Sequence, residues 1–249
     1  MRITPFLDIP IRMGTLDDAA ADLVHASQQG EPLSVRLVNA GTLFAARRDP
    51  NYWDLLRTSG INYPDGRPLF WILGGQSRQE EQIRGNDLLA LTMKLGAQQG
   101  TRHFLVGARE HTLERMVANL SSRWPECQFV GTFAPPFPPD RASRIALDEH
   151  IAATKPDIVW VGLGTPQQDR ETQRLATAHA VVAVAVGAAF DFQAGDKRTA
   201  PLWLSTIGLE WLFRLIQEPR RLWRRYLLGN MIFGWLAVRH LVRRKGLAK

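Results

Sequence analysis

The sequence predicts an α/β fold in which helices cover both faces of a mainly parallel sheet, with an amphipathic helical appendage at the C-terminus. Short runs of Val, Ile and Leu alternate with stretches of helical periodicity, and the last quarter of the chain is basic and rich in Trp and Leu. The 249 residues, 45% of them hydrophobic, are enough to bury a sizeable core. We expect that core over residues 1–200 and the appendage over residues 201–249.

The first third of the chain suggests an irregular succession of elements. A short strand is expected over Phe6 to Arg12, and Thr15, with an acidic residue three positions later, is typical of a helix start. The apolar run from Leu33 to Val38 predicts a strand that feeds a helix. A second helix is expected over Asp54 to Thr58, followed by a turn over residues 61–66.

After a polar stretch at residues 74–82, the pattern becomes regular. Helices are expected over residues 85–100, 112–123, 141–153 and 167–178, and strands over residues 103–106, 128–131, 158–161 and 181–186. In an open parallel sheet, ligands bind beyond the carboxyl ends of the strands. The residues that follow the apolar runs should therefore gather at one edge: Asn39, Asp65, Gly107, Gly164 and Asp191.

The tail concentrates positive charge. Residues 197–249 contain 12 Lys and Arg against two Glu, a net charge of +10, whereas residues 1–196 have a net charge of −3. Such a field attracts phosphates on a nucleotide, a lipid headgroup or a nucleic acid. Pro219 is expected to divide the tail into two helices. Several arginines would then share a face, namely Arg214, Arg221, Arg224 and Arg225.

The arginine face has two compatible interpretations. Guanidinium groups match phosphate oxygens and stay charged, so this face could bind a diphosphate. A solvated or membrane-surface face is the alternative, because the Trp and Leu residues opposite are typical of a helix that lies on anionic lipid.

Composition excludes several classes. Cys127 is the single cysteine, which excludes an internal disulfide, fits a reducing compartment and is expected to be buried. The N-terminus has no long apolar segment, so no secretory signal is expected. The apolar stretch from Leu227 to Val238 is short of the roughly 20 residues that span a bilayer. We expect a protein that is soluble or lies on a membrane.

Gly162 and Gly164 follow a predicted strand, and Pro166 stands where a helix would begin. Glycine permits close backbone approach, and a helix N-terminus offers N–H groups to an anion. A tight connection without a ligand would give the same pattern. The full G-x-G-x-x-G pattern is absent, which argues against a nicotinamide dinucleotide.

Two aspartates are candidates for chemistry. Asp65 lies in an expected turn, where a carboxylate could deprotonate a sugar hydroxyl or could simply bond its own backbone. Asp191, between Phe190 and Phe192, is either a functional group or a helix cap. No D-x-D occurs and the six histidines are scattered, so no metal site is predicted. A departing diphosphate would then be stabilised by the arginines.

Several blocks resemble the WecG/TagA/CpsF family of bacterial glycosyltransferases, over nearly the full length. They are Asn39 at its strand end, Pro64-Asp65-Gly66, Gly85-Asn86-Asp87-Leu88, Gly162 to Gln168, Val186-Gly187 with Phe190-Asp191-Phe192, and Ala200-Pro201 with Gly208 to Arg214 and Gln217 to Arg221. The last block is long and highly specific.

The resemblance implies a Rossmann-like core with a C-terminal appendage. It also implies an inverting, metal-independent transfer, without cofactor, of a hexose or N-acetylhexosamine from a UDP-sugar to a polyprenyl-diphosphate-linked sugar, in cell-surface polysaccharide synthesis. The enzyme would be cytoplasmic and peripheral on the inner face of the membrane. By this resemblance Asp65 would be the general base, Asn39 and Gln168 pocket residues, and the arginines the groups that close over the diphosphate. The expected substrate-binding set is Asn39, Asn86, Asp87, Gly107, Gly164, Gln168, Asp191, Arg214, Arg221 and Arg224.

Three positions depart from the family pattern and bear on the choice of donor sugar. Leu37 stands where a threonine is frequent, Gln167 where a basic residue is usual, and Asp169 where Glu is commoner. The donor could be a neutral hexose, N-acetylmannosamine or its uronic acid, and we favour a neutral hexose for an exopolysaccharide.

Two alternatives belong to other classes. A nucleic-acid-binding module would explain the basic tail but not its Trp and Leu density. A non-catalytic membrane scaffold gives no reason for Asp65 and the glycine turn to share an edge. The expected partners are therefore a UDP-sugar, a lipid-linked acceptor and an anionic membrane, and not nucleic acid. The apolar surfaces of the tail could also pair subunits away from the membrane.

Overall fold

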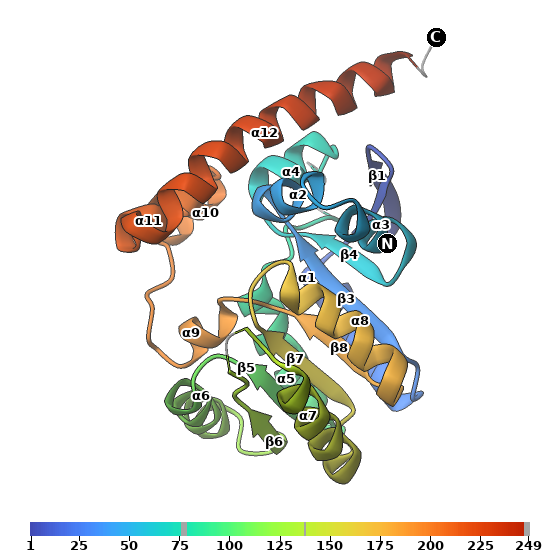
Figure 1. Cartoon of the computed structure of the whole chain (residues 1–249), viewed down its shortest axis with the longest axis vertical. Helices are drawn as coiled ribbons and strands as arrows, with labels where there is room; N and C mark the ends of the chain where they lie inside the picture. Colours follow the sequence, from blue (N-terminus) through green and yellow to red (C-terminus); the bar gives the residue numbers. More distant parts are fainter. Residues whose placement is uncertain (76–78, 137, 247–249) are drawn as a thin grey trace. The chain divides into compact units, whose positions relative to one another are not determined.

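A computed structural model describes residues 1–75, 79–136 and 138–246, without the side chains of residues 202, 205, 221, 222, 224–226 and 244–246 (Figure 1). The main sheet has, in order across it, β4 (Ile61–Pro64), β3 (Leu33–Val38), β8 (Val182–Ala185), β7 (Ile158–Gly162), β5 (Arg102–Gly107) and β6 (Gln128–Phe133). From β3 to β6 the neighbouring strands pair in parallel. The predicted α/β class with a Rossmann-like, mainly parallel sheet is confirmed.

Contacts divide the chain into two compact units. Unit 1 contains residues 1–15, 37–84 and 199–249, and unit 2 contains residues 16–36 and 85–198. Strand β3 contributes residues to both, since Arg36 belongs to unit 2 and Leu37 to unit 1. The two units are defined by the density of contacts within them. The expected boundary at residue 200 separates a core from an appendage that binds a membrane, and this boundary stays a prediction.

Unit 1 combines β4 with a hairpin and several helices. The hairpin is β1 (Arg2–Phe6) paired antiparallel with β2 (Ile9–Met13), and the helices are α2 (Ala40–Arg47), α3 (Pro50–Thr58), α4 (Arg67–Ile72), α10 (Leu202–Thr206), α11 (Glu210–Gln217) and α12 (Pro219–Gly246). Helix α12 packs against α2. Its Phe233 and Leu236 are buried in one cluster with Phe6 and Phe70, so the second half of α12 is part of this core.

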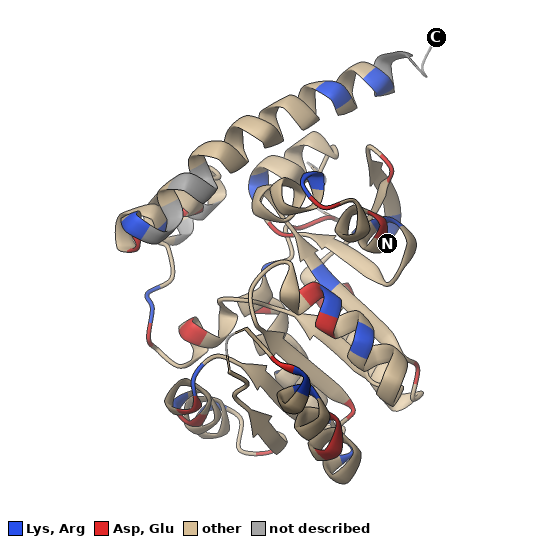
Figure 2. Cartoon of the chain, in the orientation of Figure 1, with Lys and Arg blue, Asp and Glu red and all other residues tan. Residues whose placement is uncertain are grey.

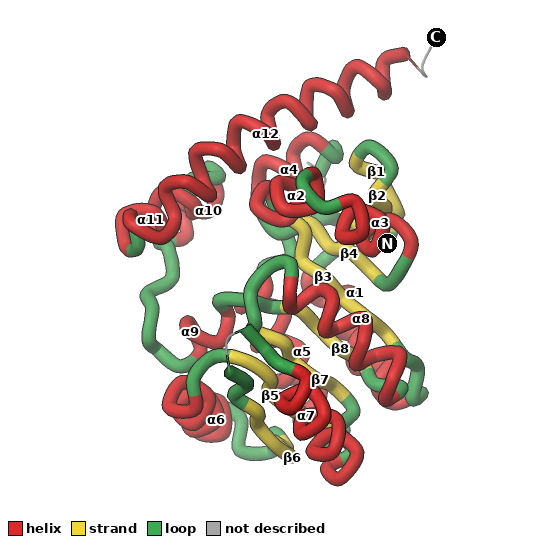
Figure 3. Tube along the Cα trace, viewed as in Figure 1, coloured by secondary structure: helices red, strands yellow, loops and turns green. Residues whose placement is uncertain are grey.

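Unit 2 contains the regular alternation of strands and helices. Its helices are α1 (Leu16–Gln28), α5 (Gly85–Ala97), α6 (Glu110–Arg123), α7 (Arg141–Thr154), α8 (Gln167–His179) and the short α9 (Ala189–Gln193). The strands (yellow) and helices (red) of this unit are distinguished in Figure 3. Strands β5 and β7 bury continuous apolar runs, including Phe104, Val106, Val159 and Val161, because helices cover them on both sides.

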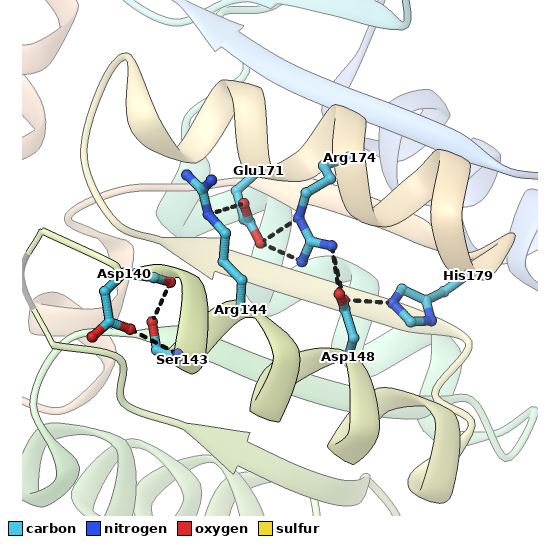
Figure 4. A network of polar contacts seen from close by, with 7 residues as sticks. All are labelled: Asp140, Ser143, Arg144, Asp148, Glu171, Arg174 and His179. Carbon is cyan, nitrogen blue, oxygen red and sulfur yellow. Dashed lines mark hydrogen bonds and ion pairs between the residues drawn. The ribbon is translucent and has the colours of Figure 1, made fainter.

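A polar network joins α7 to α8 (Figure 4). Arg174 on α8 donates to both carboxylate oxygens of Asp148 on α7, at 2.8 and 2.9 Å, and to Glu171 Oε1 at 2.7 Å. His179 Nε2 lies 2.8 Å from Asp148 Oδ1. Because α8 also begins at the glycine turn, this network helps to fix the direction in which that turn leaves the sheet.

Several expected elements were wrong in extent or kind. Residues 61–64 form strand β4 where a turn was expected, because Asn62 and Tyr63 are buried and the Asn62 amide donates to the carbonyls of Pro10 and Leu56 at 3.0 and 2.6 Å. Helix α3 starts at Pro50, earlier than expected, because Asp49 caps it by accepting from the Tyr52 N–H.

Two other expectations, the helix break at Pro219 and the burial of Cys127, are confirmed. Helix α11 ends at Gln217 and α12 begins at Pro219, as the proline indicated. Cys127 is buried. Among the described residues, no helix combines the length and apolar character needed to cross a bilayer. The polar stretch at residues 74–82 lies partly outside the described residues, at positions 76–78.

Candidate active site

Asn39 and Asp65 meet where β3 and β4 end, within unit 1. The Asp65 N–H donates to the Val38 carbonyl at 2.8 Å, which ties the two strand ends together. Asn39 Oδ1 caps α2 by accepting from the N–H groups of Gly41 and Thr42 at 2.9 and 3.1 Å. Its Nδ2 donates to Asp65 Oδ2 at 3.0 Å. The amide therefore orients the Asp65 carboxylate.

Three charged side chains surround this pair. Arg84 is carried by a segment whose Ile83 N–H donates to the Pro64 carbonyl at 2.9 Å. Glu210, the first residue of α11, forms an ion pair with Arg84 at 3.6 Å and accepts from Arg214 Nη2 at 2.6 Å. The described part of unit 1 thus gathers a carboxylate at a strand end with two guanidinium groups and a second carboxylate.

The environment changes the acidity of Asp65. Burial raises its pKa from 3.8 to about 6, and the charge of Glu210 acts in the same direction. Arg214, the Asn39 hydrogen bond and Arg84 oppose this shift without cancelling it. A carboxylate with a pKa near 6 is largely ionised at neutral pH and is a stronger base than an ordinary aspartate, which suits a general base.

Unit 2 carries the predicted glycine residues at the ends of β5 and β7. Gly107 has φ +119°, and a Cβ there would lie 2.6 Å from the Gly162 carbonyl oxygen, so only glycine fits this close approach. The Gly164 N–H donates to Gln168 Oε1 at 3.0 Å, so the buried Gln168 side chain closes the turn. Its amide also faces Gly187, since a Cβ at Gly187 would lie 3.3 Å from Oε1.

The remaining predicted residues of unit 2 lie in α5 and α9. Asn86 Oδ1 accepts from Gln193 Nε2 at 2.8 Å, and Asp87 follows it in the first turn of α5. Asp191, expected to be a functional group or a helix cap, lies in the short helix α9 and forms an ion pair with Lys197 at 2.7 Å.

The structure thus brings Asn39, Asp65 and Arg214 together in one unit, and Gly164 and Gln168 together in the other. The side chains of Arg221 and Arg224 lie outside the described residues. The roles assigned to all these residues stay predictions.

Sequence reasoning missed Arg84 and Glu210. Arg84 directly precedes the Gly85-Asn86-Asp87 block, and Glu210 stands one turn before Arg214. Both residues therefore lie close in the sequence to predicted site residues, Arg84 to Asn86 and Glu210 to Arg214.

A small pocket of about 170 Å³ lies beside the glycine turn. Its lining residues are Pro139, Arg144, Leu163, Gln167, Arg170 and Glu171. It is smaller than the roughly 300 Å³ of an ordinary ligand pocket. Within the described part of the chain, no three His, Cys, Asp or Glu side chains are grouped as metal ligands would be.

Comparison with known proteins identifies the family. Residues 4–247 match the model of the glycosyl transferase WecG/TagA/CpsF family. The chain belongs to this family. It is also 30% identical, over 195 residues, to the N-acetylglucosaminyldiphosphoundecaprenol N-acetyl-beta-D-mannosaminyltransferase of Bacillus subtilis (strain 168), an alignment that covers 78% of this chain and 74% of that relative.

Membership of the WecG/TagA/CpsF family makes this protein a glycosyltransferase, which favours the predicted enzyme over the two non-catalytic alternatives. The predicted resemblance, drawn from the blocks around Asp65, the glycine turn and the tail, is confirmed.

Proposed function

We propose that this glycosyltransferase moves a hexose or N-acetylhexosamine from a UDP-sugar to a polyprenyl-diphosphate-linked sugar, with inversion and without a metal ion. The observation that carries the proposal is the contact of Asp65 with Asn39, beside Arg84 and Arg214. This arrangement places a candidate base, Asp65, in the same site as two cations, Arg84 and Arg214. The lipid-linked acceptor is supported by the name of the relative from Bacillus subtilis.

In this mechanism Asp65 removes the proton from the acceptor hydroxyl. The freed oxygen forms a bond to the anomeric carbon of the donor while the bond from that carbon to the UDP oxygen breaks on the opposite face. The electron pair of the broken bond stays on the diphosphate, where negative charge grows. Arg214, with Arg84 beside it, stabilises that charge, because preorganised cations act strongly where charge develops. Arg221 and Arg224 are proposed to join them.

The predicted residues of unit 2 are proposed to bind substrate. Gly164 is exposed just after β7, at the strand ends where α/β proteins bind nucleotides, and the buried Gly107 ends the neighbouring β5. Gln168, Asn86, Asp87 and Asp191 supply polar groups at the same edge of that unit's strands.

The acceptor requires a membrane surface, and α12 has the character to bind one. Large apolar side chains at spacings of three and four residues are exposed on it, namely Leu227, Met231, Trp235, Val238 and Val242. The described basic residues of α12 appear in blue in Figure 2. Apolar residues flanked by Arg are typical of helices that lie on anionic lipid. We therefore propose a peripheral location on the cytoplasmic face.

Replacement of the base tests the function most directly. Asp65→Asn keeps the size of the side chain but cannot accept the proton, so we expect turnover to fall by about 100-fold or more while UDP-sugar binding is retained. The measurement is transfer from a panel of UDP-sugars to a lipid-linked N-acetylglucosamine analogue, with and without EDTA. Binding is measured by calorimetry on the same preparations.

The controls separate the parts of this proposal. Asp54→Asn removes an exposed carboxylate of α3 and should leave turnover unchanged. Near-normal turnover in Asp65→Asn excludes its role as base. Loss of turnover with EDTA, restored by Mg²⁺ or Mn²⁺, would exclude the metal-independent mechanism. Absence of transfer from every UDP-sugar would refute the donor class.

A further inference from the structure

Glu210 occupies an unexpected place for an acid. Its carboxylate accepts from Arg214 Nη2 at 2.6 Å and lies 3.6 Å from Arg84 Nε. These are the two cations to which the proposed mechanism assigns the diphosphate, and Glu210 also faces Asp65 closely enough to raise its pKa. An acid that occupies phosphate-binding groups should weaken phosphate binding, so its presence calls for a function.

The position of Glu210 is built into unit 1. The turn before α11 contains Gly208, with φ +78°, and a Cβ there would lie 3.2 Å from Trp71 and 3.4 Å from the Arg67 Cβ. The start of α11 is therefore packed against α4, which directly follows the Asp65 turn. Glycine suits this position, because a side chain there would be strained by the positive φ and would press on Trp71.

Charge balance explains what the acid does. With Asp65 and Glu210 ionised, two carboxylates face two guanidinium groups and the local charge is balanced. Without Glu210 the guanidinium groups would be drawn to Asp65, and an arginine bound to the base would hold it in the deprotonated but weakly basic state. Glu210 gives both cations another partner.

We propose that Glu210 is a positioning residue of the transfer reaction: it holds Arg84 and Arg214 beside Asp65 while the donor site is empty and yields them to the diphosphate when the donor binds. This inference rests on the proposed function. Exchange of one anionic partner for another keeps the cations in place throughout. After transfer, the carboxylate competes with UDP for the same cations and so promotes product release.

The test is Glu210→Gln, which keeps the shape of the side chain and removes its charge. We expect inorganic pyrophosphate and UDP to bind about 3- to 10-fold more tightly by calorimetry, because their competitor is lost. The acid limb of the kcat/KM profile should move to lower pH by about 0.5 to 1 unit, because Asp65 loses a neighbouring negative charge. Turnover should fall while the donor KM does not rise.

Among the residues that the structure describes, the groups that face Asp65 are Arg84, Arg214, the Asn39 amide and Glu210. Arg67 on α4 lies over the ring of Phe70. Glu210→Asp keeps the charge and should restore the acid limb to within about 0.3 unit of the wild type. Glu218→Gln, at the end of α11, removes the same charge from the same segment and should change neither pyrophosphate affinity nor the profile.

The outcomes distinguish this inference from the proposed function. An active wild type whose Glu210→Gln variant binds pyrophosphate with unchanged or lower affinity overturns the inference alone. A lowered melting temperature with an unshifted acid limb would reduce Glu210 to a structural residue and also overturn it. A wild type that transfers no sugar refutes the proposed function, whereas the pyrophosphate measurement still decides whether Glu210 competes for the two arginines.

Discussion

The carboxamide of Asn39 serves two parts of unit 1 at once. Its Oδ1 is occupied by two N–H groups of α2, so its Nδ2 must point to Asp65. This removes the usual ambiguity between the oxygen and the nitrogen of an amide side chain. The orientation of the base is therefore coupled to the start of a helix, and substitutions that disturb the cap will also disturb the base.

The raised pKa of Asp65 makes a prediction about stability. A carboxyl group whose pKa is higher in the folded protein favours folding below its unfolded pKa and loses that contribution as pH rises through about 6. At pH 8 the ionised Asp65 therefore costs stability. Asp65→Asn should raise the free energy of unfolding at pH 8 by about 2 kcal/mol, and the gain should disappear near pH 4.

Urea unfolding at the two pH values measures this difference, with Asp54→Asn as the control because its carboxylate is exposed. Equal free energies of unfolding for Asp65→Asn and wild type at pH 8 would show that burial of the ionised Asp65 carboxylate does not destabilise the protein. A gain at pH 8 would show that the base is held at a cost that function explains.

At the residue scale, sequence reasoning found Asp65 and Asn39 because both follow apolar runs that end at one edge of a sheet. It could not find the association of Glu210 with Arg84, since the two residues are 126 positions apart and lie in different elements. Residues at strand ends can be located from periodicity, whereas pairs between distant segments depend on packing.

Among elements, strands β5, β7 and β8 were predictable because they are buried on both faces and contain continuous apolar runs, namely Phe104 to Val106, Ile158 to Val161 and Val182 to Ala185. Strand β4 was not, because its sequence contains Asn62 and Pro64. The Asn62 side chain is buried only because two backbone carbonyls accept its hydrogen bonds. Hydrogen bonds that allow a polar side chain to be buried cannot be predicted from the pattern of apolar residues.

The network between α7 and α8 makes a prediction at this scale. Partial burial acts to raise the pKa of Asp148, but hydrogen bonds from His179 and Arg174 outweigh it and lower the pKa. The contribution to stability is therefore present above the unfolded pKa and is lost as pH falls through the folded one. Asp148→Asn should destabilise unit 2 by about 0.5 to 1 kcal/mol at pH 7, a value reduced for solvent screening.

Thermal unfolding at pH 7 and in acid tests this, with Glu149→Gln as a control on the next, exposed residue of α7. The difference between Asp148→Asn and wild type should shrink as pH falls below about 4. A difference that is the same at both pH values would show that the carboxylate acts through packing and not through its charge.

Among the described residues, α12 carries more exposed large apolar side chains than any other element, which leads to a prediction about membranes. Wild type should sediment with vesicles of phosphatidylcholine and phosphatidylglycerol, and less so at high salt, because screening weakens the attraction of Arg to anionic lipid. Met231→Glu combined with Val238→Glu should lower the bound fraction several-fold, since both side chains are exposed.

Ile145→Glu is the matched control, because it changes an exposed apolar residue of unit 2. If vesicle binding is unaffected by the α12 substitutions, this face does not bind the membrane. If they change only the mass found by sedimentation equilibrium, the face joins copies of the chain.

The division into two units was not predicted, because unit 1 is assembled from three separate segments that sequence order does not group.

The burial of Phe233 and Leu236 in unit 1 also bears on biogenesis. A nascent chain has all of unit 2 available once residue 198 has left the ribosome, but the other core lacks its closing helix until synthesis has passed residue 236. Until then, the face of α2 against which α12 packs is not covered by that helix. The helix proposed to recognise lipid thus also completes this core, so that the core, and with it the Asp65 site, can close only after residue 236 has been translated.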